Sequence, residues 1–234
     1  MASIVTPASP DTAQVLLAAN GRPDQIALDF AARLRRVRLG VFVALTGVLM
    51  IFVSYSSAYV VRQGLPTLDP ATGTLVRDWL PLQLPNFLLV NSLVLLVSIL
   101  TMELARRQAV RVGVSSGIAS GPAERTEADK MPWLALTAIL GLSFLAGQGL
   151  VWRELAARGF YVATSPSSSF FYLLTGMHGI HLLGGIVALL AAGAASLLRK
   201  SVASTAVVVD ATAWYWHFMT VLWVYILCLL EFAP

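Results

Sequence analysis

The chain has 234 residues, of which 57% are hydrophobic and only 12% are charged. A typical soluble domain carries about 25% charged residues, and a soluble core of this size could not bury so much apolar surface. The composition therefore excludes an ordinary soluble domain and predicts an integral membrane protein. The net charge of +4 is modest. Because the basic residues flank apolar runs and form no continuous patch, nucleic acid is not an expected partner.

The N-terminal segment, residues 1–38, is polar at its start and contains proline. A secretory signal would need an apolar stretch of roughly 7–15 residues there. Four arginines, at positions 33, 35, 36 and 38, come directly before the first apolar run. We interpret residues 1–38 as a cytoplasmic segment with a juxtamembrane anchor, loosely ordered up to about Gln25.

Five apolar stretches are long enough to cross a membrane, which takes about 20 residues. The predicted fold class is therefore an all-α integral membrane bundle of five transmembrane helices. Pro85 would lie in the first turn of the second helix, where proline is tolerated. The predicted helices cover residues 39–61, 82–104, 133–151, 170–198 and 213–232, within a transmembrane domain 39–232.

The longest connection, residues 105–132, is rich in Gly and Ser at its centre and is expected to be a flexible surface loop. Twelve of the sixteen Lys and Arg residues lie in this loop, in the N-terminal segment or after the fourth helix. Because basic loops stay in the cytoplasm, the N-terminus is expected inside and the C-terminus outside.

Aromatic and small residues suggest how the helices are placed and packed. Trp79, Trp133, Phe170–Tyr172 and Trp214–Trp216 lie at predicted helix starts, as in an interfacial belt; the alternative is ordinary aromatic packing. Small residues mark expected helix–helix faces. These are Gly40, Ala44 and Gly47 in the first helix, and Gly184, Ala188, Ala192 and Ala195 in the fourth.

Few residues offer metal or redox chemistry. The single cysteine, Cys228, cannot form an intrachain disulfide and is expected to be a buried core thiol. The three histidines are His178 and His181 in the fourth helix and His217 in the fifth. The predicted spans place His217 some 8–12 Å from the level of the other two. This offset argues against a shared haem or metal and favours hydrogen bonds to neighbouring helices, lipid or a partner subunit.

The acidic residues all fall outside the middle of the predicted helices, with Glu103 at the end of the second and Asp210 before the fifth. A proton relay needs titratable groups across the apolar span. The chain is therefore not expected to conduct protons on its own.

The string SSFFYLLTGMHGIHLLGG, residues 168–185, contains Phe-Phe, Thr-Gly, His-Gly-x-His and a following glycine. In this pattern it resembles the cytochrome c oxidase subunit III family. The string WYWHFMTVLWVYIL, in the last helix, resembles its Trp-His-Phe segment. The matching residues are Phe170, Phe171, Thr175, Gly176, His178, Gly179, His181, Gly185, Trp216, His217, Phe218 and Trp223.

The third helix is also similar to the family through Gly141, Phe144, Gln148 and Glu154, and the resemblance covers about residues 35–232. Three positions depart from it. Thr220 stands where relatives commonly have an aspartate, and Val48 and Val151 stand where many have glutamates. The chain resembles the shorter, five-helix form of the family.

The resemblance implies a non-catalytic subunit III of a haem-copper terminal oxidase in aerobic respiration, located in a bacterial inner membrane. The complex would reduce oxygen to water and move protons, with haem and copper in partner subunits and no catalytic, cofactor or metal-binding residue in this chain. The motif residues would contact lipid or neighbouring subunits, and the chain would stabilise catalytic subunit I, hold phospholipid and support proton uptake. It would associate with further oxidase subunits and with a larger respiratory assembly.

Other functions stay open. An accessory subunit of a quinol oxidase or of a nitric oxide reductase fits the same resemblance. A small transporter is disfavoured because it should show paired intramembrane charges or broken helices. A membrane cytochrome b is disfavoured by the histidine levels.

Overall fold

The computed structural model describes residues 10–69, 71–80, 84–118, 132–197 and 202–232. This part of the chain is mainly helical, and five of its helices are long and apolar enough to cross a membrane, which confirms the predicted fold class. The helices are α1 (Pro10–Gly64), α2 (Phe87–Ile118), α3 (Pro132–Ala157), α4 (Pro166–Leu197) and α5 (Val202–Phe232).

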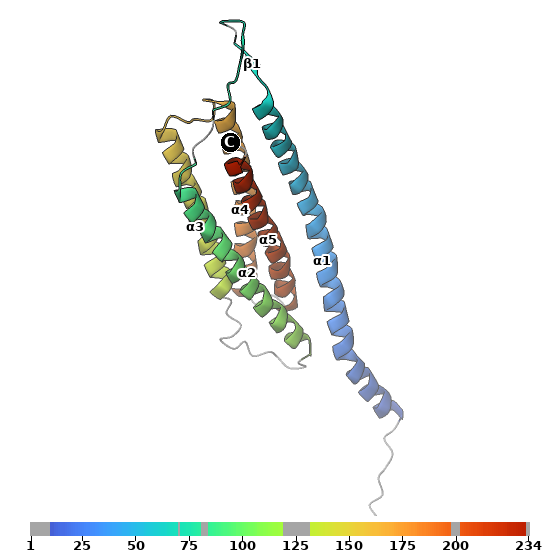
Figure 1. Cartoon of the computed structure of the whole chain (residues 1–234). Helices are drawn as coiled ribbons and strands as arrows, with labels where there is room; N and C mark the ends of the chain where they lie inside the picture. The colour runs from blue at the N-terminus through green and yellow to red at the C-terminus, as the bar shows by residue number, and fades with distance from the viewer. Residues whose placement is uncertain (1–9, 70, 81–83, 119–131, 198–201, 233–234) are drawn as a thin grey trace, which may run out of the picture.

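Successive helices run in opposite directions, and α2 to α5 form a bundle with α1 along one side (Figure 1). Strands β1 (Thr67–Leu68) and β2 (Leu75–Val76) pair antiparallel in the α1–α2 connection. This hairpin and the C-terminus lie at one end of the bundle, here called the hairpin end. The opposite end, where α1 reaches beyond the other helices, is called the network end.

The helices are longer than the predicted spans. Helix α1 begins at Pro10, so the segment predicted to be loosely ordered is helical from that residue on. Helix α2 begins at Phe87, after Pro85, and continues to Ile118. Residues 105–118 are therefore helical and not part of the predicted loop, whose remaining residues 119–131 lie outside the described part. The hydrogen-bond pattern of a helix continues into polar sequence. A prediction from apolar runs, in contrast, ends each helix at the membrane boundary.

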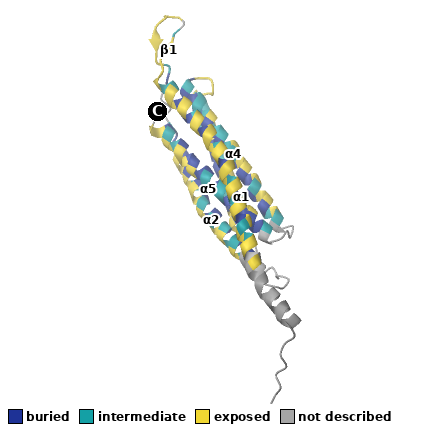
Figure 2. Cartoon of the chain, turned by 90° about the vertical axis from the view of Figure 1, so that its right-hand side faces the viewer, coloured by how far each residue is buried: buried dark blue, intermediate teal, exposed yellow. Residues whose placement is uncertain are grey.

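Helix α1 is the least buried of the five. Only 11% of its most apolar stretch is buried within the chain, compared with 39–44% in the other helices, and Figure 2 shows its exposed surface. Its inner face carries Leu45, Phe52 and Tyr59, which repeat every seven residues. The predicted packing face was wrong: Gly40, Ala44 and Gly47 are exposed. In α4 the corresponding set is mixed, with Ala192 buried and Gly184 exposed.

Large aromatic side chains fill the centre of the bundle. Trp216 and Trp223 of α5 are fully buried, and α5 begins eleven residues earlier than predicted. Trp216 therefore belongs to the core and not to an interfacial belt at the start of its helix. The prediction for Cys228 was also wrong, because this residue is exposed on the outer face of α5.

Candidate functional site

The two tryptophans of the α5 motif fix how α5 packs on α2. The indole Nε1 of Trp216 donates a hydrogen bond to Ser98 Oγ at 2.9 Å. The indole Nε1 of Trp223 donates to Ser92 Oγ at 2.9 Å. All four side chains are buried, where an unpaired polar group would be costly. These two bonds, seven residues apart on α5 and six apart on α2, set the register of the antiparallel pair.

Glycines of α3 and α4 make room for Trp216. A Cβ at Gly141 would lie 2.6 Å from the edge of its ring, and a Cβ at Gly185 would lie 3.3 Å from it. These two motif glycines therefore allow the helices to close around the indole. Gly176 and Gly179 differ, because the nearest atom to a Cβ there would be a side-chain atom at 3.6 or 3.8 Å, which is an ordinary van der Waals distance. Neither glycine serves a close backbone approach within this chain.

His178 is enclosed by aromatic rings. Its ring centroid lies 5.0 Å from Trp223 and 6.1 Å from Phe144, and its side chain is fully buried. The fold thus brings the histidine of the α4 motif against the last tryptophan of the α5 motif. Neither ring nitrogen has a hydrogen-bond partner among the described residues.

His181, one turn further along α4, is bonded locally. Its Nδ1 lies 2.8 Å from the carbonyl oxygen of Met177, and its ring packs edge-on against Phe52 of α1. The hydroxyl of Tyr215 donates to the His181 carbonyl oxygen at 2.8 Å. His181 therefore helps to join α1, α4 and α5.

The other α4 motif residues lie toward the hairpin end. Thr175 donates to the Phe171 carbonyl oxygen and accepts a hydrogen bond from Trp152 Nε1 at 3.2 Å. The ring of Phe170 packs edge-on against Tyr59 and lies 6.4 Å from Trp79. These contacts close the bundle at the point where the hairpin leaves it.

His217 lies apart from the other two histidines. Its Nε2 is 3.4 Å from the carboxylate of Glu103 on α2. It precedes Trp223, the residue that packs against His178, by six positions, which is about 9 Å along the helix. This separation agrees with the predicted offset in level. Within the described residues, no group of three or more His, Cys, Asp or Glu side chains is arranged to hold a metal ion.

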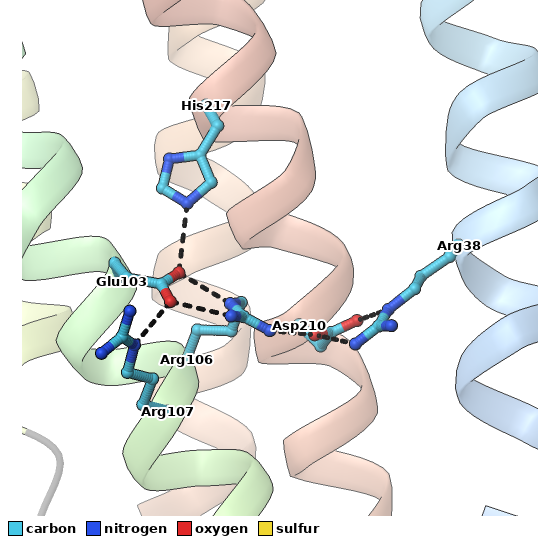
Figure 3. A network of polar contacts seen from close by, with 6 residues as sticks. All are labelled: Arg38, Glu103, Arg106, Arg107, Asp210 and His217. Atoms are coloured by element: carbon cyan, nitrogen blue, oxygen red, sulfur yellow. Dashed lines mark hydrogen bonds and ion pairs between the residues drawn. The ribbon is translucent and has the colours of Figure 1, made fainter. Parts of the chain in front are cut away.

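His217 and Glu103 belong to a charged network that joins α1, α2 and α5 (Figure 3). Its centre is Asp210 of α5, whose side chain is only 1% exposed. Arg38 of α1 donates to both carboxylate oxygens of Asp210, at 2.7 and 2.8 Å. Arg106 of α2 donates to the same carboxylate at 3.2 Å. Asp210 thus holds two other helices through paired, charge-assisted hydrogen bonds.

Arg106 extends the network along α2. It donates to both carboxylate oxygens of Glu103, at 2.7 and 2.8 Å, and Arg107 donates to Glu103 at 2.7 Å. Each of the two carboxylates therefore accepts hydrogen bonds from two of the three guanidinium groups. The guanidinium carbon of Arg38 also lies over the ring of Trp214, 5.9 Å from its centroid.

This network was not predicted from the sequence because the predicted fifth helix begins eleven residues too late. Asp210 was placed before that helix, yet it lies inside α5 and in a stretch apolar enough to span a membrane. Glu103 likewise lies well inside α2. A usable signal was present: Arg38, Arg106 and Asp210 all flank predicted spans on the same side of the membrane, and opposite charges at one level attract.

The three departures from the family pattern lie in packed surroundings. Thr220 is fully buried, and its hydroxyl donates to the Trp216 carbonyl oxygen. Val151 is also fully buried. Val48 is partly buried and packs against the core from α1. Apolar or self-bonded groups thus fill all three positions.

The site is therefore a helix-joining core of a multi-pass membrane protein, with a charged network at one end. Comparison with known proteins identifies the family. A sequence model of cytochrome c oxidase subunit III matches residues 30–232. The chain belongs to this family.

Named relatives agree with this assignment. Cytochrome c oxidase subunit 3 of Synechocystis sp. is 30% identical over 186 residues, covering 79% of this chain and 70% of the relative. The protein of that name from Danio rerio is 29% identical over 195 residues, covering 81% and 67%. A probable cytochrome c oxidase subunit 3 of Mycobacterium leprae is 32% identical over 100 residues. That alignment covers 43% of this chain and about half the length of the relative, 50%.

Proposed function

We propose that this chain is the non-catalytic subunit III of a haem-copper terminal oxidase of aerobic respiration. The observation that carries the proposal is the family match over residues 30–232, which reaches all five helices. The use of the histidines supports an accessory role. His178 is enclosed by aromatic rings, His181 is bonded to its own helix, and His217 contacts Glu103. None of these arrangements directs two histidines toward the same haem or metal ion.

In this role the chain binds catalytic subunit I and other oxidase subunits, holds phospholipid, and supports proton uptake. Haem and copper reside in the partners. The exposed apolar side of α1, which includes Phe42, Val43 and Met50, offers a surface for lipid or for a neighbouring subunit. The aromatic core and the charged network keep that helix attached to the bundle. The oxidase in turn joins a larger respiratory assembly.

Purification of the native complex tests the proposal. The tagged chain, extracted from its own membrane in mild detergent, should bring with it a haem- and copper-containing partner that consumes oxygen with reduced cytochrome c. The chain expressed alone should show no haem absorbance. A complex that oxidises only quinol, or one that reduces nitric oxide, would replace the proposal by the corresponding accessory role. One tightly bound haem per isolated chain would contradict an accessory role altogether.

We also propose that the N-terminus faces the cytoplasm of a bacterium and the C-terminus faces outside. The concentration of basic residues at the network end supports this orientation. In a Cys228→Ser background, Thr72→Cys in the hairpin should react with an impermeant thiol reagent added to intact cells. Ser116→Cys, near the end of α2, should not react. The opposite labelling pattern would reverse the orientation.

A further inference from the structure

The middle of the bundle contains buried polar groups with no partner. His178 of α4 is fully buried, and neither its Nδ1 nor its Nε2 atom is hydrogen-bonded among the described residues. Gln148 of α3 is 4% exposed, and neither its Oε1 nor its Nε2 atom has a partner there. Buried polar groups are nearly always satisfied in folded proteins, by the chain or by ordered water. The four unpaired polar atoms of these two side chains therefore indicate that a further polar group binds them.

The two side chains come from facing turns of neighbouring helices. Phe144, one turn before Gln148 on α3, contacts the His178 ring. The indole N–H of Trp152, one turn after Gln148, donates a hydrogen bond to the Thr175 hydroxyl of α4. Because α3 and α4 run antiparallel, Gln148 lies opposite the turn of α4 between Thr175 and His178. Residues four apart share a helix face, so the glutamine amide and the histidine ring lie along the same α3–α4 seam.

Other partners near this seam are already engaged. The Thr175 hydroxyl donates to the Phe171 carbonyl oxygen and accepts from Trp152. The Asn91 side chain donates from Nδ2 to the Phe144 carbonyl oxygen at 3.0 Å. The His178 ring packs against the aromatic rings of Phe144 and Trp223, which accept no ordinary hydrogen bond from it.

We propose that the seam between His178 and Gln148 is a binding site for water. A neutral imidazole has one donor and one acceptor nitrogen, and a primary amide has both donor and acceptor groups. A single water can accept from the glutamine amide and donate to the unprotonated ring nitrogen. Buried waters typically make about three such bonds to groups that would otherwise be unsatisfied. The site thus adds a polar link between α3 and α4 that the side chains do not make directly.

This site is separate from the charged network. His217, the member of the network on α5 that lies toward the middle, precedes Trp223 by about 9 Å of helix. Trp223 packs against the His178 ring on the α5 side of the seam, and its indole N–H is bonded to Ser92 of α2. The water is therefore enclosed by the aromatic core, and it serves as a structural link and not as part of a continuous proton path.

The three histidines make the proposal testable by solid-state NMR. The full chain, labelled with 15N-histidine and reconstituted in lipid bilayers, would give one pair of ring-nitrogen signals for each of its three histidines, with the His178 pair assigned from a His178→Phe sample. In water-edited spectra, magnetisation from water should reach the His178 ring. Gln148→Met keeps a similar volume but removes both amide groups, so the transfer should be lost. The control Ser143→Ala changes the exposed opposite face of α3, where the hydroxyl bonds its own helix, and should preserve the transfer.

Three results would overturn the proposal. They are a dry His178 ring in the unmodified chain, transfer that survives Gln148→Met, and a direct bond from the Gln148 amide to the ring. If Gln148→Met does not fold, the unmodified chain still decides between a wet and a dry ring. A high-resolution density map of the purified complex provides a second measurement, because a peak between the two side chains is required.

Discussion

The network end and the middle of the bundle handle polar groups in different ways. At the network end, Asp210 and Glu103 are each bonded by more than one arginine, and the contacts join three helices. In the middle, His178 and Gln148 have no partner in the described chain, and the helices are held by aromatic packing and by the Trp–Ser bonds. His217 belongs to the first arrangement and His178 to the second, although both are motif histidines.

The difference follows from charge and depth. A formal charge in an apolar surrounding is stable only with an opposite charge and hydrogen bonds, whereas a neutral imidazole can be enclosed by rings at a smaller cost. Removing one partner should therefore damage the network end most. In the middle, changes of side-chain volume should matter more than changes of charge.

The largest effect is expected for Asp210→Asn, which leaves Arg38 and Arg106 beside a neutral amide. Breaking a buried pair costs about 3–5 kcal/mol, and because both arginines are partly exposed we expect about 2–4 kcal/mol here. Thermal unfolding of the purified chain measures it. Glu154→Gln, which removes the exposed pair with Arg158, is the matched control and should change stability by less than about 1 kcal/mol. Equal effects of the two substitutions would remove the distinction between the network and a surface pair.

Gly147→Ala tests the packing of the bundle middle. A Cβ there would lie 2.1 Å from the Asn91 side-chain oxygen, and Asn91 cannot move without losing its bond to the Phe144 carbonyl oxygen. Overpacking of this kind costs about 1–3 kcal/mol.

The control for that substitution is Gly47→Ala, on the exposed side of α1 with no atom within 4 Å of the added Cβ. Replacing a helical glycine gains up to about 1 kcal/mol of helix propensity, so the isolated chain should be unchanged or more stable. If Gly47→Ala weakens only the assembled complex, that side of α1 contacts a partner.

A smaller loss is expected for His217→Gln. The histidine contact with Glu103 is long, 3.4 Å, while the carboxylate keeps its bonds to Arg106 and Arg107. We expect a loss of less than about 1 kcal/mol, as for an exposed ion pair. Thermal unfolding of this variant and of Asp210→Asn, measured side by side, compares how much each residue contributes to the stability of the network. A loss as large as that of Asp210→Asn would place the histidine at the centre of the network.

The smallest effect concerns Asp78 at the hairpin end, which is bonded by Arg62 from the end of α1. The Arg62 hydrogen bond holds the pKa of this carboxyl below its ordinary value of 3.8. A lowered pKa stabilises the folded form above the ordinary value, and that contribution is lost as the pH falls below it. Acidification through pH 4 and lower should therefore lower the protection factors of the β1 and β2 amides, which compare the measured exchange rate with the intrinsic rate at each pH, while Asp78→Asn should show low protection factors already at neutral pH. Identical pH profiles for the two proteins would exclude Asp78 as the cause.

The sequence alone predicted the number of helices, because runs of about 20 apolar residues are a strong signal. It also singled out the motif residues that meet between α4 and α5, such as His178, Trp216 and Trp223. It did not place Asp210, since a charged residue ends an apolar run even where the helix continues. The exposure of Gly47 and Cys228 could not be predicted either, because small residues and thiols suit both a packed face and a lipid-facing one.

The distance along the chain between Arg38 and Asp210, 172 residues, has a consequence for how the protein is made. At 5–20 residues per second, a ribosome needs roughly 10–30 seconds to progress from one to the other. During that interval Arg106 already has Glu103 on its own helix, but Arg38 has no carboxylate and must extend its guanidinium toward the headgroups. The nascent chain therefore holds its first helix only loosely, and synthesis of the fifth helix completes the attachment of the first.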